Sequence, residues 1–238
     1  MSPTLETFDA VVVGGGPAGL SAALALGRAR RRVLLTTCGP TRNAPASAAH
    51  NVFTRDGTPP AELVAIGREQ LRNYDVVVRD ECATDVRRAE TNYVLSLVSS
   101  DVQARGLVLA SGVRDVLPDI PGFAELWGTG VLHCPYCHGW EVANLPLAIY
   151  GRGEDALHLS KLIRGWTSDL ILFTDGDPEL PASDVQRIRS RGIEIREEAV
   201  QRLAGSPELE AVVLESGETI PRAALFTRPK QELRSDLA

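Results

Sequence analysis

The stretch FDAVVVGGGPAGLSAALALGRARRRVLLTT, residues 8–37, constrains the fold more than any other part of this chain. Ala10 to Val13 form a short apolar run of the kind that is buried on both faces of a parallel sheet. Val33 to Leu35 begin a second such strand. The order therefore predicts one βαβ unit with parallel strands. Between the strands, a helical apolar stripe is formed by Leu20, Ala23, Leu24 and Leu26.

The turn between the first strand and the helix has the pattern G-x-G-x-x-G, with glycines at 14, 16 and 19 and alanine at 18. Gly14 permits the tight turn, Gly16 lets the backbone approach a pyrophosphate, and Gly19 lets the helix pack on the strand. The amides at the start of the helix then face the anion. In this βαβ context we expect a dinucleotide site, and a ligand-free glycine turn is the alternative.

One position departs from the usual dinucleotide-binding pattern. An acidic residue is expected at the end of the second strand, where it accepts hydrogen bonds from the ribose hydroxyls. Here that position is Thr37. A threonine hydroxyl can still bond a ribose, although a neutral acceptor is weaker than a carboxylate. Thr37 is therefore predicted to contact the nucleotide, with reduced strength.

The strand–glycine turn–helix–strand pattern returns in residues 145–177, LPLAIYGRGEDALHLSKLIRGWTSDLILFTDGD. Gly151, Gly153 and Ala156 fit G-x-G-x-x-A. The predicted fold class is therefore α/β, with two Rossmann-like doubly wound domains. The proline-containing stretch 116–123 is the candidate linker. The expected organisation is a first domain at 1–115, a second at 116–227, and the start of a return to the first domain at 228–238.

Between the two βαβ units the pattern is less regular. Residues 40–60 are rich in Pro, Asn, Ser and Thr and predict a long ordered loop. We expect a helix at 60–73 and strands near 74–78, 92–98 and 106–112.

Composition excludes several classes of function. The formal net charge of −6 argues against nucleic acid and anionic membrane surfaces as partners. The most apolar run, residues 10–27, contains GGGPAG, which would break a membrane helix, and the N-terminus shows no secretion signal. Four cysteines do not make a disulfide framework for 238 residues. A reducing cytoplasm is the expected location.

The stretch HCPYCHGW, residues 133–140, contains Cys134-x-x-Cys137. A zinc site would need four ligands, and a structural disulfide would be reduced in the cytoplasm, so both are disfavoured. A redox role requires a helix to begin between the cysteines, which favours a thiolate. His138 could then shuttle the proton, or it could merely cap a turn. Cys38 and Cys82 are interpreted as isolated, small buried residues without a chemical role.

Taken in order, the motifs VVVGGGPAGLSAA, RNAPA, HNVFTRDGTPPAEL, LVLASGVRDVLPDIPG, CPYCHGWEV and GRGEDALHLSKL resemble the thioredoxin-reductase-like flavoproteins over nearly the whole chain. The likeness is strongest to the branch of dithiol oxidases that close disulfides in gliotoxin- and holomycin-type natural products. The resemblance implies a homodimer that binds FAD. It also implies that Cys137 faces the flavin, that Cys134 attacks or releases the substrate sulfur, and that the cofactor is contacted by Gly14, Gly16, Ala18, Gly19, Thr37, Arg42, Asn43, His50, Asn51 and Gly112.

Three departures from that family bear on function. Thioredoxin reductases usually carry an aspartate at the position of His138. Residues 174–177, Thr-Asp-Gly-Asp, occupy the place of the basic cluster that holds the 2′-phosphate of NADPH, which argues against NADPH. Asp175 could instead accept the ribose of NADH. The family's second segment of the FAD domain is also expected to be missing after residue 238.

The predicted function is a flavin-dependent thiol–disulfide oxidoreductase. A substrate dithiol would be oxidised through Cys134 and Cys137, and oxygen would reoxidise FAD with formation of peroxide. The substrate could be a small molecule or a thioredoxin-like protein. One alternative is the reverse flow, an NAD(P)H-dependent thioredoxin-disulfide reductase. The second is a truncated, catalytically inert flavin- or thiol-sensing module.

Overall fold

In the computed structural model, which describes residues 5–237, the predicted N-terminal βαβ unit is present. It consists of β1 (Glu6–Val13), α1 (Pro17–Arg28) and β2 (Val33–Thr36), and the two strands are parallel. Pro17 stands at the first position of α1, where its fixed φ suits a helix and its missing N–H costs nothing. Arg28 lies in the last turn, where a cation is favoured by the helix dipole.

These elements belong to a first unit, formed by residues 5–44, 58–114 and 231–237. Its six-stranded sheet has the order β3-β2-β1-β6-β5-β4. The first four strands in that order are parallel, and β5 and β4 are antiparallel to their neighbours. The remaining elements are α2 (Pro60–Leu71), β3 (Val76–Arg79), β4 (Ala83–Ala89), β5 (Asn92–Leu97) and β6 (Asp101–Leu109).

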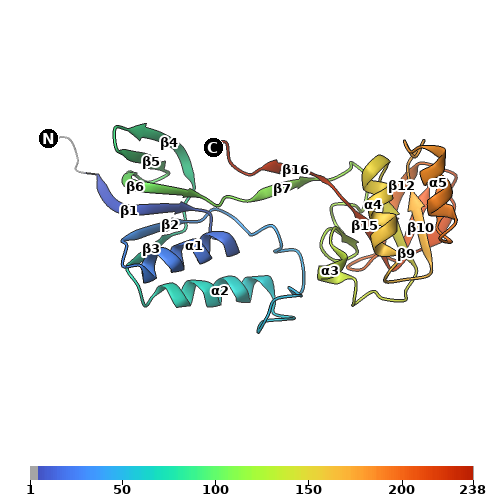
Figure 1. The fold of residues 1–238 in the computed structure, drawn as a ribbon, viewed down its shortest axis with the longest axis horizontal. Coiled ribbons are helices and arrows are strands. Elements are labelled where there is room, and N and C mark those ends of the chain that lie inside the picture. Colours follow the sequence, from blue (N-terminus) through green and yellow to red (C-terminus); the bar gives the residue numbers. More distant parts are fainter. Residues whose placement is uncertain (1–4, 238) are drawn as a thin grey trace. The chain divides into compact units, whose positions relative to one another are not determined.

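Both helices of the first unit cover the same face of its sheet (Figure 1). Leu20 and Ala23 of α1 and Leu71 of α2 are buried there against Val12 and Leu35 of the sheet. The opposite face carries a separate apolar cluster, which includes Phe8, Val11, Leu34, Leu95 and Val102. Because both faces are covered, β1 and β2 read as continuous apolar runs rather than as alternating ones.

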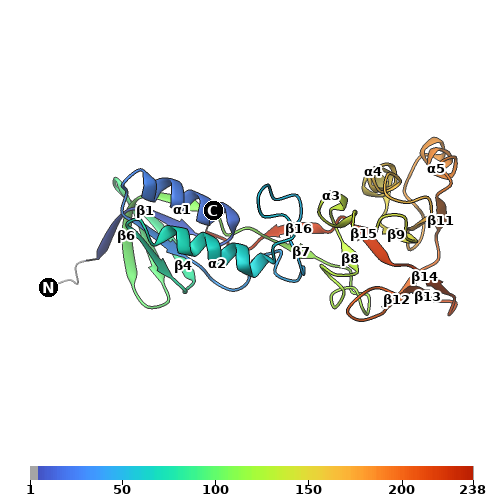
Figure 2. The ribbon, with the colours of Figure 1, turned by 90° about the horizontal axis from the view of Figure 1, so that it is seen from below.

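The second unit, Pro45–Gly57 with Asp115–Lys230, contains a five-stranded parallel sheet of order β11-β10-β9-β15-β8 and a three-stranded antiparallel sheet. Helices α4 and α5 lie on one side of the parallel sheet and the small sheet on the other (Figure 2). The elements are β8 (Val131–Leu132), α3 (Pro135–His138), β9 (Leu147–Tyr150), α4 (Gly153–Ile163), β10 (Leu170–Phe173), α5 (Ala182–Arg189), β11 (Glu194–Arg196), β12 (Val200–Ala204), β13 (Ala211–Leu214), β14 (Thr219–Pro221) and β15 (Ala224–Thr227).

The expected α/β class with parallel sheets is confirmed, and one assignment differs from the sequence prediction. Residues 45–57 were expected in the first domain and pack with the second unit. This stretch comes close to Gly128, where an added Cβ would lie 2.9 Å from the Cβ of Pro45. Two further strands, β7 (Val113–Val116) and β16 (Lys230–Leu233), pair with each other at the positions where the chain passes between units.

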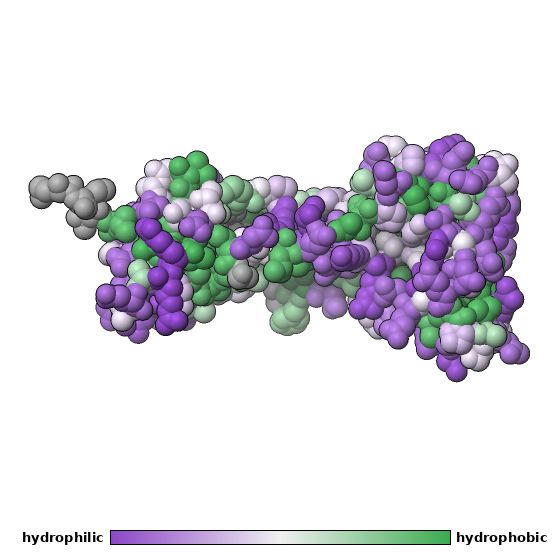
Figure 3. Space-filling view, turned by 90° about the horizontal axis from the view of Figure 1, so that it is seen from above, coloured by the Kyte–Doolittle hydropathy of each residue, from purple (hydrophilic) through white to green (hydrophobic). Residues whose placement is uncertain are grey.

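Hydrophilic residues cover most of the face of the second unit that is seen in Figure 3. Within residues 5–237, no helix is long and apolar enough to cross a membrane.

The core of the second unit should be sensitive to truncation of Phe226, which is fully buried on β15 between β9 and β8. Phe226→Ala should lower the free energy of unfolding by about 3–5 kcal/mol, because it removes buried apolar contacts and leaves a cavity. Phe53→Ala is the matched control, since the ring of Phe53 is 94% exposed, and it should change stability by about 0.5 kcal/mol or less. Urea unfolding followed by circular dichroism measures both, and equal effects would contradict this packing.

Candidate functional site

The first glycine turn forms an open cradle at the start of α1. Gly14 has a φ of +116°, and a Cβ on it would lie 2.1 Å from the carbonyl oxygen of Ala110. A Cβ on Gly19 would lie 1.7 Å from the carbonyl oxygen of Gly14. At Gly16, in contrast, the nearest atom is Cγ2 of Thr41 at 3.8 Å, so there is room in front of the helix. The sequence prediction of a tight turn with a close helix–strand contact is confirmed at this site.

The electrostatics of the cradle suit an anion. The first turn of α1 contains no acidic residue, and the partial positive charge of the helix N-terminus is therefore not neutralised there. In the described part of the chain, the amides of Gly15 and Gly16 donate to no backbone carbonyl. Free amides, a helix N-terminus and an open Gly16 together fit the pyrophosphate of a dinucleotide such as FAD.

Other predicted cofactor residues lie along the same sheet edge. Because β1, β2, β3 and β6 are parallel, the segments after their carboxyl ends meet there. Thr37 packs directly on the glycine turn, since a Cβ on Gly15 would lie 2.5 Å from its Oγ1. Gly112, with a φ of +76°, follows β6, and its carbonyl accepts from the amide of Arg234 at 3.1 Å.

Four predicted cofactor contacts are divided between the units. Arg42 and Asn43 lie in the first unit, on the loop that follows Thr37. His50 and Asn51 lie in the second unit. The resemblance assigns all four to the cofactor, and these assignments stay predictions.

Cys134 and Cys137 stand at the two ends of the first turn of α3. Cys134 is the N-cap, and its carbonyl accepts from the amides of Cys137 and His138, both at 3.2 Å. This turn brings the two Sγ atoms to 2.9 Å from each other, and both side chains are half-buried. The expected helix between the cysteines is confirmed, and the two thiols are within bridging reach.

Trp166 packs against the α3 turn. A Cβ on Gly139 would lie 2.6 Å from Nε1 of that tryptophan, so only glycine lets the chain pass there. The ring of Tyr136 also meets Trp166 edge to face, with centroids 5.5 Å apart. The dithiol is therefore mounted on a short helix that is fixed by aromatic packing.

His138 lies next to the second cysteine in a half-buried position. Burial lowers its pKa, while the charge of Glu141 raises it and that of His50 lowers it. His50 itself lies between two carboxylates: Nε2 is 3.4 Å from Glu141 Oε1, and Nδ1 is 3.5 Å from Asp56 Oδ2. Glu141 and Asp56 lie within two of the quoted motifs, CPYCHGWEV and HNVFTRDGTPPAEL, but only the folded chain shows that both carboxylates meet His50.

The second glycine turn is closed by the chain's own residues. Gly153 has a φ of +56° and donates its amide to the carbonyl of Pro178 at 2.9 Å. Arg152, between the two glycines, extends to the end of β10, where its guanidinium lies 3.6 Å from Asp175 and 3.5 Å from Glu179. The carboxylate of Asp175 also accepts from the amide of Val200 at 2.9 Å. Asp175, predicted to accept a ribose, is thus already bonded within the unit.

The N-terminus of α4 differs in charge from that of α1. Glu154 and Asp155 both stand in its first turn, and Asp155 pairs with Arg228 at 3.0 Å. Carboxylates in the first turn stabilise a helix, but they repel a phosphate that would bind there. Gly151 and Ala156 have the predicted places around the turn, yet its charge does not favour a second dinucleotide.

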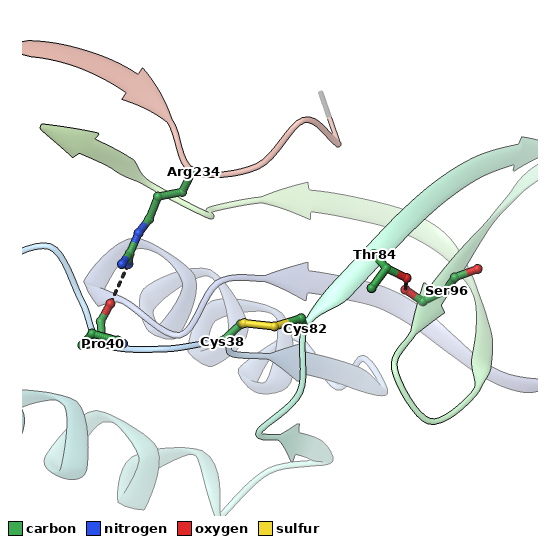
Figure 4. Close-up of a disulfide and its surroundings, with 6 residues drawn as sticks. All are labelled: Cys38, Pro40, Cys82, Thr84, Ser96 and Arg234. Carbon is green, nitrogen blue, oxygen red and sulfur yellow. Dashed lines mark hydrogen bonds between the residues drawn. A yellow bond between two sulfur atoms is a disulfide. The ribbon is translucent and has the colours of Figure 1, made fainter. Parts of the chain in front are cut away.

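The interpretation of Cys38 and Cys82 as isolated buried residues is wrong. The two cysteines form a disulfide with a Cα–Cα distance of 4.9 Å, and Cys38 is exposed (Figure 4). Their separation of 44 residues concealed this contact. They follow β2 and β3, two neighbouring parallel strands, and the strand order is the signal that could have placed them together. Within residues 5–237, no group of three His, Cys, Asp or Glu residues could hold a metal ion.

Residues 8–228 match the family of pyridine nucleotide-disulphide oxidoreductases. The chain is 31% identical to thioredoxin reductase sirT of Leptosphaeria maculans, over all of this chain and 79% of that protein. It is 35% identical to thioredoxin reductase tcpT of Claviceps purpurea, over 74% of this chain and 58% of that protein. Among solved structures, that of HlmI is similar with a TM-score of 0.91 and 37% identity, over 97% of this chain and 74% of HlmI. Four curated relatives are spanned over only 44% to 62% of their length.

The half-buried His138 should titrate below its ordinary pKa of 6.5. Glu141→Gln should lower this pKa further, since it removes the charge that favours the imidazolium, and NMR titration of the histidine ring measures both values. The matched control is Glu215→Gln, in the turn after β13, which should leave the titration unchanged.

The same shift makes stability depend on pH. Because the folded state binds a proton at His138 less readily than the unfolded state, its contribution is present above pH 6.5 and is lost as the pH falls toward the lowered pKa. A titration of His138 above pH 6.5 would contradict both expectations.

Proposed function

Because the chain is a thioredoxin reductase-like member of the pyridine nucleotide-disulphide oxidoreductase family, we propose that it is a FAD-dependent oxidase of dithiols. A substrate dithiol is oxidised to a disulfide through Cys134 and Cys137, and dioxygen is the final electron acceptor. The observation that carries this proposal is the pair of Sγ atoms 2.9 Å apart at the start of α3. The fold proposed for both units is Rossmann-like, and the working assembly is a homodimer.

The first glycine turn is the proposed place of FAD. Gly14, Gly16 and Gly19 would hold its pyrophosphate, and Thr37 its ribose. Ala18 adds an amide at the N-terminus of α1 without adding charge. Bound there, FAD would supply an acceptor for two electrons, which dioxygen finally receives.

The dithiol chemistry needs only the residues of the α3 turn and its neighbours. One substrate thiolate attacks Sγ of Cys134 in the oxidised pair, and Cys137 leaves as a thiolate. The second substrate thiol then attacks the substrate sulfur of the mixed disulfide and releases Cys134. The products are a substrate disulfide and two cysteine thiols, so two electrons and two protons have moved to the protein.

His138 is the proposed proton acceptor in this exchange. Its lowered pKa keeps the imidazole neutral near pH 7, and only a neutral imidazole can take a proton from a thiol. Glu141, whose charge raises that pKa, would stabilise the imidazolium after the transfer. His50, held between Glu141 and Asp56, keeps the Glu141 carboxylate in place.

The second glycine turn supports the proposed direction of electron flow. Gly153 gives its amide to Pro178, Arg152 is paired with Asp175 and Glu179, and two carboxylates stand at the start of α4. Each of these features disfavours NAD(P)H, which the reductase direction requires. One observation favours that alternative: Arg152 lies at the end of β10, where a 2′-phosphate would need a cation. To bind such a phosphate, the guanidinium of Arg152 would first have to leave the carboxylates of Asp175 and Glu179.

The relay can be tested with the 238-residue chain after incubation with FAD and desalting. We expect near-equimolar retained flavin and anaerobic loss of its visible absorbance on addition of a small dithiol. Cys134→Ser and Cys137→Ser should each abolish this loss, because neither variant can form the Cys134–Cys137 disulfide that the substrate attacks. His138→Gln should slow it about 100-fold at neutral pH.

His158→Gln, on the exposed side of α4, is the matched control and should keep the rate of the unmodified chain. A colourless protein after desalting would refute the FAD site, and an unchanged rate in Cys137→Ser would refute the relay.

Nucleotide specificity provides an independent test. NADPH and NADH should leave the flavin absorbance unchanged under the same anaerobic conditions, while the dithiol removes it. The double variant Glu154→Gln, Asp155→Asn should bind NADPH at least about 3-fold more tightly than the unmodified chain does. The reason is that the variant has no carboxylates at the start of α4 to repel the phosphates. Fluorescence titration measures this affinity. Reduction by NADPH within seconds, without reduction by small dithiols, would establish the reductase direction.

A further inference from the structure

The Cys38–Cys82 disulfide joins two segments at the edge of the first unit that carries the glycine cradle. Cys38 lies two residues after the end of β2, and Cys82 directly precedes β4, after the end of β3. Strands β2 and β3 are parallel neighbours, so both segments leave the sheet on the side of the cradle. Figure 4 shows the cross-link between these two segments.

The segment that contains Cys38, residues 37–44, forms one wall of the cradle. Thr37 packs on Gly15, and Cγ2 of Thr41 is the atom nearest to the open position at Gly16. At Gly39 the chain has a φ of +73°, and nothing lies within 4 Å of an added Cβ. Besides the disulfide, the segment is held at Thr37, whose amide donates to the carbonyl of Arg79 at 3.0 Å, and at Pro40, whose carbonyl accepts from Arg234 Nη1 at 2.5 Å (Figure 4). Between these anchors, Cys38 and Gly39 are exposed.

The segment that contains Cys82 is anchored more firmly. Asp80 pairs with Arg68 of α2 at 2.6 Å, and the carboxylate of Glu81 accepts from the amide and the hydroxyl of Ser99 at 3.1 Å and 2.8 Å. The disulfide therefore fastens the exposed stretch of the wall at Cys38 and Gly39 to a part of the unit that is fixed by helix α2 and by the connection after β5. A covalent bond at this place limits how far the wall can move from the cradle.

We propose that the Cys38–Cys82 disulfide is a thiol-reversible clasp that holds the wall of the dinucleotide site and thereby sets the affinity for FAD. The proposal rests on the proposed function, which places FAD in the cradle. The reductant is a small-molecule dithiol, the same chemical class as the proposed substrate. One thiolate attacks Sγ of Cys38, the more exposed of the two residues, and Cys82 leaves as a thiolate. The second thiol of the small molecule then attacks its own sulfur in the mixed disulfide, and Cys38 leaves. Two electrons and two protons pass to the protein, which then holds two thiols.

The experiment uses the 238-residue chain with Cys134→Ser and Cys137→Ser, so that the only cysteines are those of the clasp. One sample is kept oxidised, and a second is reduced with dithiothreitol and desalted anaerobically. Iodoacetamide labelling and mass measurement should find no labelled cysteine in the first sample and two in the second. The dissociation constant of FAD is then measured by flavin fluorescence.

We expect reduction to weaken FAD binding about 3- to 10-fold, since the wall must be ordered again when FAD binds. The variant with Cys38→Ser and Cys82→Ser in the same background should bind FAD like the reduced sample and should not respond to dithiothreitol. Equal affinity in the oxidised and reduced samples would overturn the clasp and leave the FAD site intact. Absence of FAD binding in both samples would overturn the proposed function together with the clasp.

Hydrogen exchange separates a clasp from a merely structural disulfide. In the reduced sample, a clasp should raise exchange only in residues 37–44 and 80–82. Faster exchange throughout β1 and α1 would show general loss of stability, and the clasp would then be rejected.

Discussion

The contact between Gly19 and Gly14 is the constraint on which the rest of the first unit depends. With a Cβ on Gly19 only 1.7 Å from the carbonyl oxygen of Gly14, α1 can lie against β1 only if residue 19 has no side chain. This close packing directs the N-terminus of α1 to the edge of the sheet where the parallel strands end. The strand order, and not proximity in the sequence, then places Thr37, the disulfide and Gly112 on that edge.

Short sequence patterns predicted the helices and strands that form from residues close together in the chain. The apolar runs, the glycine spacings and the Cys-x-x-Cys turn each depend on residues within one βαβ unit or one helical turn, and β1, α1, β2, β9, α4, β10 and α3 were found where they were expected. Contacts that depend on strand order were not predicted. The Cys38–Cys82 disulfide spans 44 residues, and it forms because β2 and β3 are neighbours in the sheet.

The neighbours of His138 show the same limit at the dithiol. His50 comes from residues 45–57, a stretch without helix or strand whose contact with the turn after α3 was not predicted. Its contact with Glu141 at 3.4 Å connects that stretch to the turn after α3. Titratable groups that meet through a long loop have no characteristic spacing, so their electrostatic coupling becomes visible only in the folded chain.

The two glycine turns show how similar backbones can have opposite preferences for ligands. At the first turn, the amides of Gly15 and Gly16 have no carbonyl partner in the described chain, and no carboxylate opposes an anion. At the second, Gly153 is bonded to Pro178, and Glu154 and Asp155 occupy the place that a phosphate would take. The second turn therefore places two carboxylates of the chain itself at its helix N-terminus. The first turn therefore suits an anion, and the second turn does not.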